Sequence, residues 1–139
     1  MATSKSAKHR AGMKIRRGVL GNAHVERAER NKTPFDEPFQ TLITEAAWGS
    51  VWSRPQLTLR ERSMITVSLL AARGLDDELK LHLRATANTG ASREDIREAL
   101  LHVAIYAGVA AANHAMAVAR QVFAEMDKDK GKDKGKDKA

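Results

Sequence analysis

The sequence has no cysteine, so disulfide bonds, thiol nucleophiles and Cys-x-x-Cys redox chemistry are excluded. Long apolar runs are missing as well, because the longest, residues 99–112, is interrupted by His102 and is too short to cross a bilayer. The basic N-terminus is not followed by the apolar segment of a secretory signal. We therefore expect a cytoplasmic protein that does not contact a membrane.

Motifs that hold phosphates, nucleotides or metals are also missing. No Gly-rich phosphate loop, Gly-x-Ser-x-Gly, nucleotide fingerprint or His-Glu-x-x-His occurs. Glu98 and His102 repeat the spacing of Glu78 and His82, which would suit a metal between two helices, but di-iron bundles use Glu-x-x-His instead. We expect neither a metal nor a cofactor, which leaves acid/base chemistry by His and Glu.

The net charge of +7 resembles that of a nucleic-acid-binding protein until it is divided along the chain. Residues 1–17 hold six Lys or Arg and no acidic residue, and residues 127–139 hold six Lys against four Asp. The central residues 18–126 carry twelve basic and thirteen acidic side chains, so the positive charge belongs to the termini. We expect disordered tails at 1–13 and 127–139, one helical domain at 14–126, and no nucleic-acid partner.

Apolar residues recur at helical spacing, and the alternation typical of β-strands does not occur. The pattern predicts an all-α, single-domain bundle of about six helices. The sequence signals are capping boxes at Thr58–Glu61 and Ser92–Asp95, a left-handed helix end at Gly74, a short helix over Val19–Arg30, a helix after Asp36 that ends near Gly49, and a last helix over Val109–Met126. From Ala99 onward one helix is apolar on every side, which predicts a central position.

Glu78 and His82 are the leading candidates for catalysis. Their i, i+4 spacing sets the carboxylate one helical turn before the imidazole, so that Glu78 can orient His82 and raise its basicity. His82 also shares its helix face with Leu79, Leu83 and Thr86. The pair is therefore either a general acid/base or a structural contact.

Other polar and aromatic residues allow two interpretations each. Arg62 either extends to water or points its charge into a pocket. Trp48 and Trp52 share one side of a helix if it continues through Gly49, and form either a core plug or an apolar pocket wall. His24 is either a surface histidine or part of a site at a subunit contact, and His102, Asn113 and His114, among apolar residues, are expected in the core or at a subunit interface.

Four stretches together resemble one protein family. They are RRGVLGNAHVERA (16–28), FQTLITEAAWGSVWSRPQL (39–57), RERSMITVSLLAA (60–72) and ELKLHLRATANTGASREDIREALLHVAIYAGVAAAN (78–113). In this order they resemble the 4-carboxymuconolactone decarboxylases of the protocatechuate branch of the β-ketoadipate pathway. The resemblance implies aromatic catabolism and the all-helical fold of the alkylhydroperoxidase D-like proteins.

Active peroxidases of that wider group carry Cys-x-x-Cys ahead of a histidine, whereas this chain has Leu75 and Glu78 at those positions, so a peroxidase reaction is excluded. Ala110 stands where the decarboxylases usually have proline, which changes the stiffness of a turn. The resemblance also implies a homo-oligomer, a trimer or a hexamer, because the family forms rings or trimers of dimers.

The implied reaction converts γ-carboxymuconolactone, an anionic lactone, to β-ketoadipate enol-lactone and CO2 without a cofactor. On this basis His82, held by Glu78, would deliver a proton to the ring or donate to the oxyanion. Arg62 would bind the acetate side-chain carboxylate, and Trp48 or Trp52 would line an apolar wall. Arg84 is expected to serve a neighbouring subunit or a salt bridge and, with His24, is a further candidate for substrate binding.

Two alternatives stay open. The chain could be a member of the same family that acts on a different lactone or carboxylate. It could instead be a non-enzymatic helical binding module whose basic tails hold nucleic acid or an acidic surface.

Overall fold

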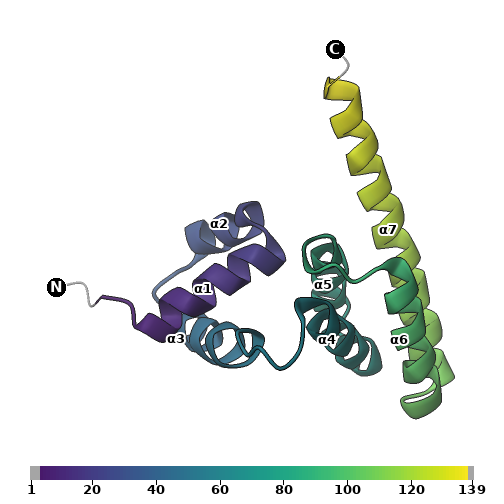
Figure 1. The fold of residues 1–139 in the computed structure, drawn as a ribbon, viewed down its shortest axis with the longest axis horizontal. Coiled ribbons are helices and arrows are strands. Elements are labelled where there is room, and N and C mark those ends of the chain that lie inside the picture. Colours follow the sequence, from purple (N-terminus) through teal and green to yellow (C-terminus); the bar gives the residue numbers. More distant parts are fainter. Residues whose placement is uncertain (1–3, 138–139) are drawn as a thin grey trace. The chain divides into compact units, whose positions relative to one another are not determined.

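The computed structural model describes residues 4–137, with side chains up to Asp133. Its elements are α1 (Ala7–Leu20), α2 (Asn22–Asn31), α3 (Glu37–Ile43), the π-helix η1 (Thr44–Trp52), α4 (Leu59–Arg73), α5 (Asp76–Thr89), α6 (Arg93–Tyr106) and α7 (Val109–Asp137) (Figure 1). The predicted all-α class is confirmed. The described residues form seven α-helices rather than about six, partly because Gly21, at φ 90°, separates α1 from α2 within the segment predicted as one helix.

The chain divides into two compact units, Met1–Arg62 and Ser63–Ala139. A single domain over residues 14–126 therefore stays a prediction. Among the helices of the described range, none combines the length and apolar character needed to cross a membrane.

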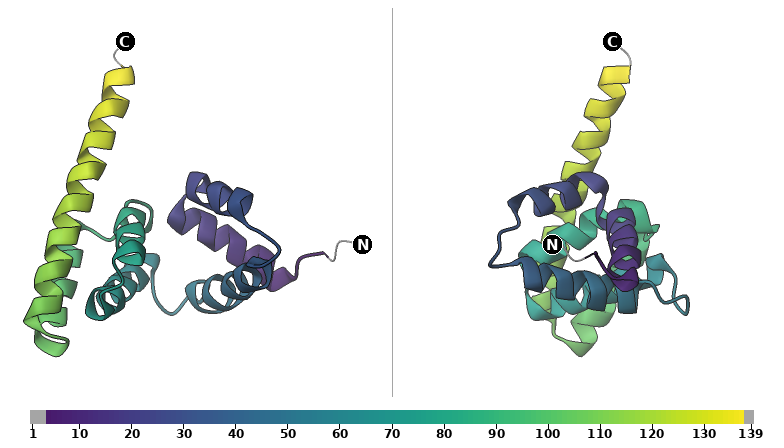
Figure 2. Two further views of the ribbon diagram at one scale, coloured as in Figure 1. Left: turned by 180° about the vertical axis from the view of Figure 1, so that it is seen from behind. Right: turned by 90° about the vertical axis from the view of Figure 1, so that its left-hand side faces the viewer.

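In the first unit, α1 packs chiefly against η1, backbone on backbone (Figure 2). A Cβ atom added at Gly12 would lie 2.8 Å from the backbone nitrogen of Gly49, and one added at Gly49 would lie 2.7 Å from the carbonyl oxygen of Lys8. Carbon atoms do not approach nitrogen or oxygen that closely without displacing them. The two glycines therefore let the helices come closer than any side chain would permit.

This contact explains why residues 7–13 are helical although their composition predicted a disordered tail. Helix α1 begins after Ser6, whose Oγ accepts a hydrogen bond from the backbone nitrogen of His9 at 3.0 Å. The buried residues of α1 are His9, Gly12, Arg16 and Val19. Helix burial here rests on glycine and polar side chains, which a composition rule based on apolar content does not count. The predicted tail's residues 1–3 lie outside the described residues.

The predicted helix after Asp36 begins at Glu37, with Pro38 in its first turn. The Asp36 carboxylate accepts from the backbone nitrogen of Thr33 at 2.9 Å and makes no capping hydrogen bond to α3. The helix does not end near Gly49 as predicted, because the chain continues as η1 to Trp52. Within η1, Ser50 Oγ donates to the carbonyl of Glu45 at 3.0 Å. Wider π turns of this kind recur at functional sites.

From Thr58 onward, the helix starts and several helix ends follow the sequence signals. Thr58 and Glu61 form the predicted capping box, with hydrogen bonds of 2.9 and 3.1 Å between side chain and backbone. Ser92 and Asp95 form the second. Gly74 has φ +68° and separates α4 from α5, as predicted. A core formed mainly by α5, α6 and α7, with Val67 and Ala71 of α4, holds the helices together.

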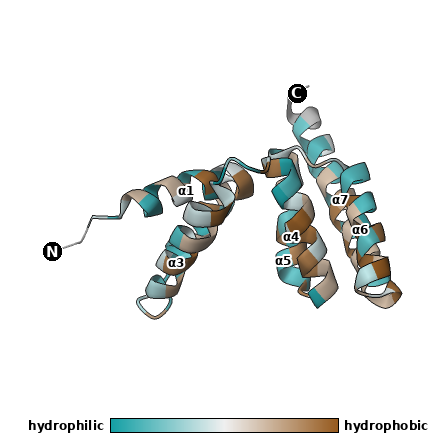
Figure 3. Ribbon diagram, turned by 60° about the horizontal axis from the view of Figure 1, so that its bottom comes forward, coloured by the Kyte–Doolittle hydropathy of each residue, from teal (hydrophilic) through white to brown (hydrophobic). Residues whose placement is uncertain are grey.

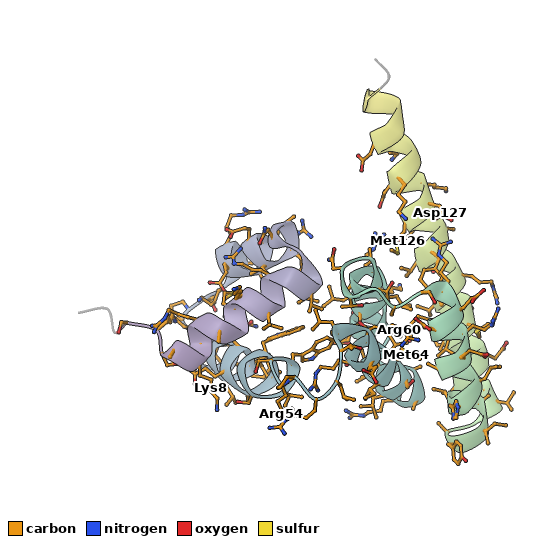
Figure 4. All side chains as sticks on the ribbon, viewed as in Figure 1. Lys8, Arg54, Arg60, Met64, Met126 and Asp127 are labelled. Carbon is orange, nitrogen blue, oxygen red and sulfur yellow. The ribbon has the colours of Figure 1, made fainter. Side chains whose placement is uncertain are left out.

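Helix α7 continues to Asp137, past Met126 where the sequence predicted its end. Two arginines contact its extension: Arg93 Nη2 lies 2.6 Å from Asp127 Oδ1, and Arg84 Nη1 lies 3.4 Å from Asp129 Oδ2 (Asp127 is labelled in Figure 4). The expected disorder of the tail therefore does not hold for residues 127–137, which are helical. Opposite charges three residues apart in the Lys/Asp repeat, such as Asp127 and Lys130, favour this conformation, whereas the like charges four residues apart oppose it. Residues 138–139 lie outside the described residues.

Helix α6 is not buried on all sides, contrary to the expectation of a central helix. Ile105 and Tyr106 are exposed, at 77% and 85%. Hydrophobic residues of α4 and α6 line shallow hollows in the second unit. Figure 3 shows where hydrophobic residues occur along these two helices. We call the residues Ile65, Leu69, His102 and Tyr106 the α4–α6 face.

Candidate active site

Helix α5 carries the predicted acid/base pair. Its first turn holds Asp76, Asp77 and Glu78, whose negative charges favour a helix N-terminus. Leu83 is fully buried and His82 is half-buried, whereas Glu78, one turn earlier, is exposed. The imidazole therefore lies at the boundary between the core and the surface, where a group can exchange a proton with a bound molecule. Its catalytic role and its orientation by Glu78 stay predictions.

The two tryptophans lie together on η1. Their ring centroids are 5.0 Å apart with the planes tilted by 34°, and both side chains are buried. The condition for a shared side, a helix that continues through Gly49, is met because the chain is π-helical there. Burial of both indoles fits a core plug and equally fits an apolar wall that a ligand would cover, so both interpretations of Trp48 and Trp52 are retained.

Arg62 is half-buried, and both interpretations of its guanidinium stay open. Its Nη2 donates to the carbonyl oxygen of Arg54 at 3.0 Å, in the turn after η1 (Arg54 is labelled in Figure 4). Its Nε is buried and donates to no described residue. A buried N–H without an acceptor is uncommon in folded proteins and leaves a donor for the carboxylate of a ligand.

A further arginine of the first unit is more deeply buried, and the predictions from sequence missed it. Arg16 is 6% exposed, and its Nη1 donates no hydrogen bond to a described residue. The carboxylate paired with it belongs to Glu29, whose Oε1 lies 3.7 Å from Nη1, beyond hydrogen-bond range. The sequence did contain a signal, since Gly12, Arg16 and Val19 recur at helical spacing on one face of α1.

His24, at the start of α2, is half-buried rather than a surface histidine. Burial lowers its pKa from the usual value, and the positive charges of Arg16 and Arg27 lower the pKa further. Burial is also the main cause of the lowered pKa of His9 on α1. Both imidazoles therefore favour their neutral form in the folded protein.

We expect the free energy of unfolding to fall as the solution is acidified. A histidine with a lowered folded pKa binds its proton first in the unfolded chain, so its contribution is fully present above the unfolded value of 6.5 and is lost as the pH falls towards and through the folded pKa. The measurement is the urea midpoint at about pH 7.5 and about pH 5.5, for the unmodified protein and His24→Gln. A pH dependence that His24→Gln leaves unchanged would contradict the assignment to this group.

Other polar candidates lie elsewhere on the second unit. Arg84 pairs with Glu125 and Asp129 of α7, as its salt-bridge interpretation predicted, and its role as a substrate contact stays a prediction. His102, Asn113 and His114 are exposed, so the core location considered for them is wrong, while a subunit interface stays a prediction. His114 Nε2 lies 2.8 Å from Asp76 Oδ2. Within residues 4–137, no group of three or more His, Asp or Glu is placed to hold a metal ion.

Comparison with known proteins places the chain among decarboxylases. The model of the carboxymuconolactone decarboxylase family matches residues 37–121. The chain is 42% identical over 119 residues to a 4-carboxymuconolactone decarboxylase of Acinetobacter baylyi, which covers 86% of this chain and 89% of that protein. It is 46% identical over 115 residues to the nitrosuccinic acid decarboxylase of Metarhizium robertsii, which covers 83% of this chain and 80% of that protein.

A shorter match of 39 residues, 49% identical, joins 28% of this chain to 81% of a 4-carboxymuconolactone decarboxylase sequence of Pseudomonas putida. The family match spans more than half of the chain, and the two longer matches extend over most of it. On these grounds, the chain belongs to the carboxymuconolactone decarboxylase family.

Proposed function

We propose that the protein is a carboxy-lyase that converts 4-carboxymuconolactone to β-ketoadipate enol-lactone and CO2. The observation that carries the proposal is the 42% identity to the Acinetobacter baylyi decarboxylase over 89% of that protein. The substrate would be a small anionic lactone, and the reaction would belong to aromatic catabolism by the β-ketoadipate pathway. A cytoplasmic location stays a prediction.

The reaction can proceed without a prosthetic electron sink because the substrate contains one. The bond from the ring carbon to the leaving carboxylate breaks, and its electron pair moves through the ring double bond onto the lactone oxygen. CO2 leaves, and a dienolate remains. A proton then adds to the ring carbon beside the carbonyl, the carbonyl re-forms, and the double bond has moved. The protein must stabilise the oxyanion and supply one proton.

His82 is the residue proposed to supply that proton, with Glu78 one turn earlier to hold the imidazole. The support is the half-buried position of His82 on the packed face of α5. Arg62 binds the carboxylate that the substrate keeps, through its buried Nε–H, which has no acceptor among described residues. Trp48 or Trp52 provides the apolar wall that separates the leaving carboxylate from water.

The direct test is to mix purified protein with freshly generated 4-carboxymuconolactone and to follow CO2 and the enol-lactone together. The expected result is that both appear in equal amounts and at a rate proportional to protein concentration. Release of neither product, by a protein that is folded by circular dichroism, would reject the proposal.

A second substrate has support of its own, because the chain is 46% identical to a nitrosuccinic acid decarboxylase. Nitrosuccinate, like the lactone, contains its own electron acceptor, since the nitro group can accept the electron pair that the departing CO2 leaves behind. The two acids are compared as competing substrates by their kcat/KM values. The carboxymuconolactone assignment requires that the lactone be the better substrate.

A non-enzymatic binding module would need its charged termini for binding, whereas a decarboxylase would not need them for turnover. Removal of residues 131–139 leaves the ion pairs of Asp127 and Asp129 in place, and a decarboxylase is expected to keep its turnover. A module that acts through its basic tail would lose salt-dependent affinity for an acidic surface. The N-terminal residues do not offer an equivalent deletion, because His9 and Gly12 are buried in α1.

We expect a homo-oligomer in which a second copy of the chain covers the α4–α6 face. Leu69 is 60% exposed and lines both hollows of that face, so Leu69→Lys should reduce the oligomer to smaller species. Leu42→Lys is a matched control, because Leu42 on α3 is also 60% exposed. Sedimentation velocity gives the mass of each variant. A monomeric unmodified protein, or equal masses for all three proteins, would contradict this interface. Trimer or hexamer remains the predicted order.

A further inference from the structure

Arg16 is a buried positive charge whose hydrogen bonding is incomplete. Only 6% of the residue is exposed, and Nη1 donates no hydrogen bond to a described residue. The Glu29 carboxylate shares its charge with another cation, since its Oε2 lies 3.0 Å from Lys32 Nζ. Burial lowers the pKa of Arg16, which means that the surroundings do not fully compensate the charge. A guanidinium in this state gains from an additional anion.

The surroundings of Arg16 suit an anion. His24 follows Gly21 at the start of α2, close enough for the Arg16 charge to disfavour its protonated form. A neutral imidazole can still donate one N–H without adding a second buried charge. The neighbouring Arg17 does not serve Arg16's function, because its Nη1 is paired with Glu26 at 2.6 Å on the surface. Among its described residues, the first unit therefore holds a deeply buried cation whose charge acts on a neutral imidazole.

The names of the two longer matches contain acids that differ in carbon skeleton. Decarboxylation of either acid requires the enzyme to stabilise a negative charge on oxygen. A carboxymuconolactone carries a lactone carbonyl, and nitrosuccinic acid carries a nitro group. Loss of CO2 would place a negative charge on oxygen in both acids, as a dienolate formed through the ring double bond of the lactone or as a nitronate formed at the carbon that bears the nitro group. A buried guanidinium stabilises such a charge more than an exposed one does, because little water screens the interaction.

We infer that Arg16, assisted by His24, forms an anion site that binds the oxygen of the electron-accepting group of the substrate. The inference rests on the proposed decarboxylase function. When the carbon–carboxylate bond breaks and CO2 departs, the electron pair ends on this oxygen, and the N–H groups of Arg16 hold the resulting anion. When the proton arrives at carbon, the charge on oxygen disappears and the product is released. Arg16 itself gains and loses no proton.

The kinetic test compares the same substitution at two adjacent arginines. Removal of one donor to a developing oxyanion lowers kcat by roughly 10²-fold, so this loss is expected of Arg16→Gln, with KM changed less than about threefold. Arg17→Gln should leave both constants near those of the unmodified protein. Arg16→Lys, which keeps the charge and one set of donors, should recover part of kcat. Equal kcat values for Arg16→Gln and Arg17→Gln would overturn the inference.

A binding test gives a readout besides turnover. The probe is 3-nitropropionate added as its preformed nitronate, with succinate as the dicarboxylate control. The unmodified protein should bind the nitronate at least about tenfold more tightly than succinate, as expected for an analogue of the charged intermediate. Arg16→Gln should lose that preference. Retention of the preference by Arg16→Gln, or its absence from the unmodified protein, would also overturn the inference.

Glu29→Gln separates an anion site from a structural ion pair. If Arg16 only fastens α1 to α2 through Glu29, removal of either partner should destabilise the protein and reduce activity to the same extent. An anion site predicts instead that Glu29→Gln keeps or strengthens nitronate binding, because the Arg16 charge is less compensated. Decarboxylation that persists without an effect of Arg16 rejects the anion site alone, whereas Arg16-dependent nitronate binding without any decarboxylation rejects the proposed function alone.

Discussion

Replacement of His82 by alanine is expected to lower kcat for decarboxylation by about 10²–10⁴-fold, the usual contribution of a general acid or base. The reason is that the electron pair left by CO2 needs a proton at carbon, and water would have to supply it in place of the imidazole. His82 is half-buried beside the fully buried Leu83, so the substitution removes little packing. Single-turnover measurements of CO2 and enol-lactone separate loss of CO2 from protonation.

The matched control is His102→Ala on α6. His102 follows Glu98 at the same spacing as His82 follows Glu78, but it is exposed and its ring lies 6.2 Å from that of Tyr106. The His102→Ala variant should keep the kcat of the unmodified protein. If the Glu78 carboxylate orients His82, the Glu78→Gln variant should have a kcat between those of the unmodified protein and His82→Ala. The assignment is wrong if His82→Ala folds normally and retains kcat within about threefold of the unmodified protein, far less than a general acid contributes.

The helix boundaries that could be predicted from sequence depend on neighbours in the chain. The side chains of Thr58 and Ser92 each cap a backbone nitrogen three residues later, so a short window of sequence holds the whole interaction. The same holds for Gly74, whose positive φ suits a residue without Cβ. Local chemistry of this kind is visible without any tertiary structure.

What could not be predicted depends on contacts distant in sequence. The start of α1 rests on backbone contacts between Gly12 and η1, and the extension of α7 on the ion pairs of Asp129 with Arg84 and of Asp127 with Arg93. Both segments look like solvated tails when only composition is read. The helix expected to end near Gly49 continues because that glycine faces α1 across a close contact rather than ending a helix.

In the candidate site too, local spacing could be predicted from the sequence, whereas burial could not. The i, i+4 relation of Glu78 and His82 was readable from the sequence, and the structure adds the burial of the face they flank. Arg16 was counted with the basic N-terminal charge, because composition alone does not distinguish it from Arg17, although only Arg16 stands at helical spacing from both Gly12 and Val19. The structure distinguishes them, since Arg16 is buried near Glu29 and Arg17 pairs with Glu26 at the surface.

Gly12→Ala is expected to destabilise the protein by about 3 kcal/mol, at the upper end of the cost of inserting one methyl group into a packed region. The added Cβ would lie 2.8 Å from the backbone nitrogen and 3.1 Å from the Cα of Gly49, and its closest contact would be the carbonyl oxygen of Thr44. These are backbone atoms of η1, which cannot rotate away as a side chain can. Urea unfolding followed by tryptophan fluorescence measures the loss, because both indoles lie on η1.

Gly18→Ala in the same helix serves as the control, because it is expected to raise the free energy of unfolding where Gly12→Ala lowers it. Apart from its chain neighbours and the backbone of its own helix, nothing lies within 4 Å of a Cβ at Gly18, so the substitution adds no clash with another element. It removes the flexibility of glycine from a helix interior and should stabilise the protein by about 0.5–1 kcal/mol. A pair of variants with equal midpoints would mean that the close approach of α1 to η1 is not maintained in solution. If the urea midpoint falls for Gly12→Ala and rises for Gly18→Ala, the helix propensity of alanine raises stability at Gly18. At Gly12 the clash with η1 then outweighs that gain in stability.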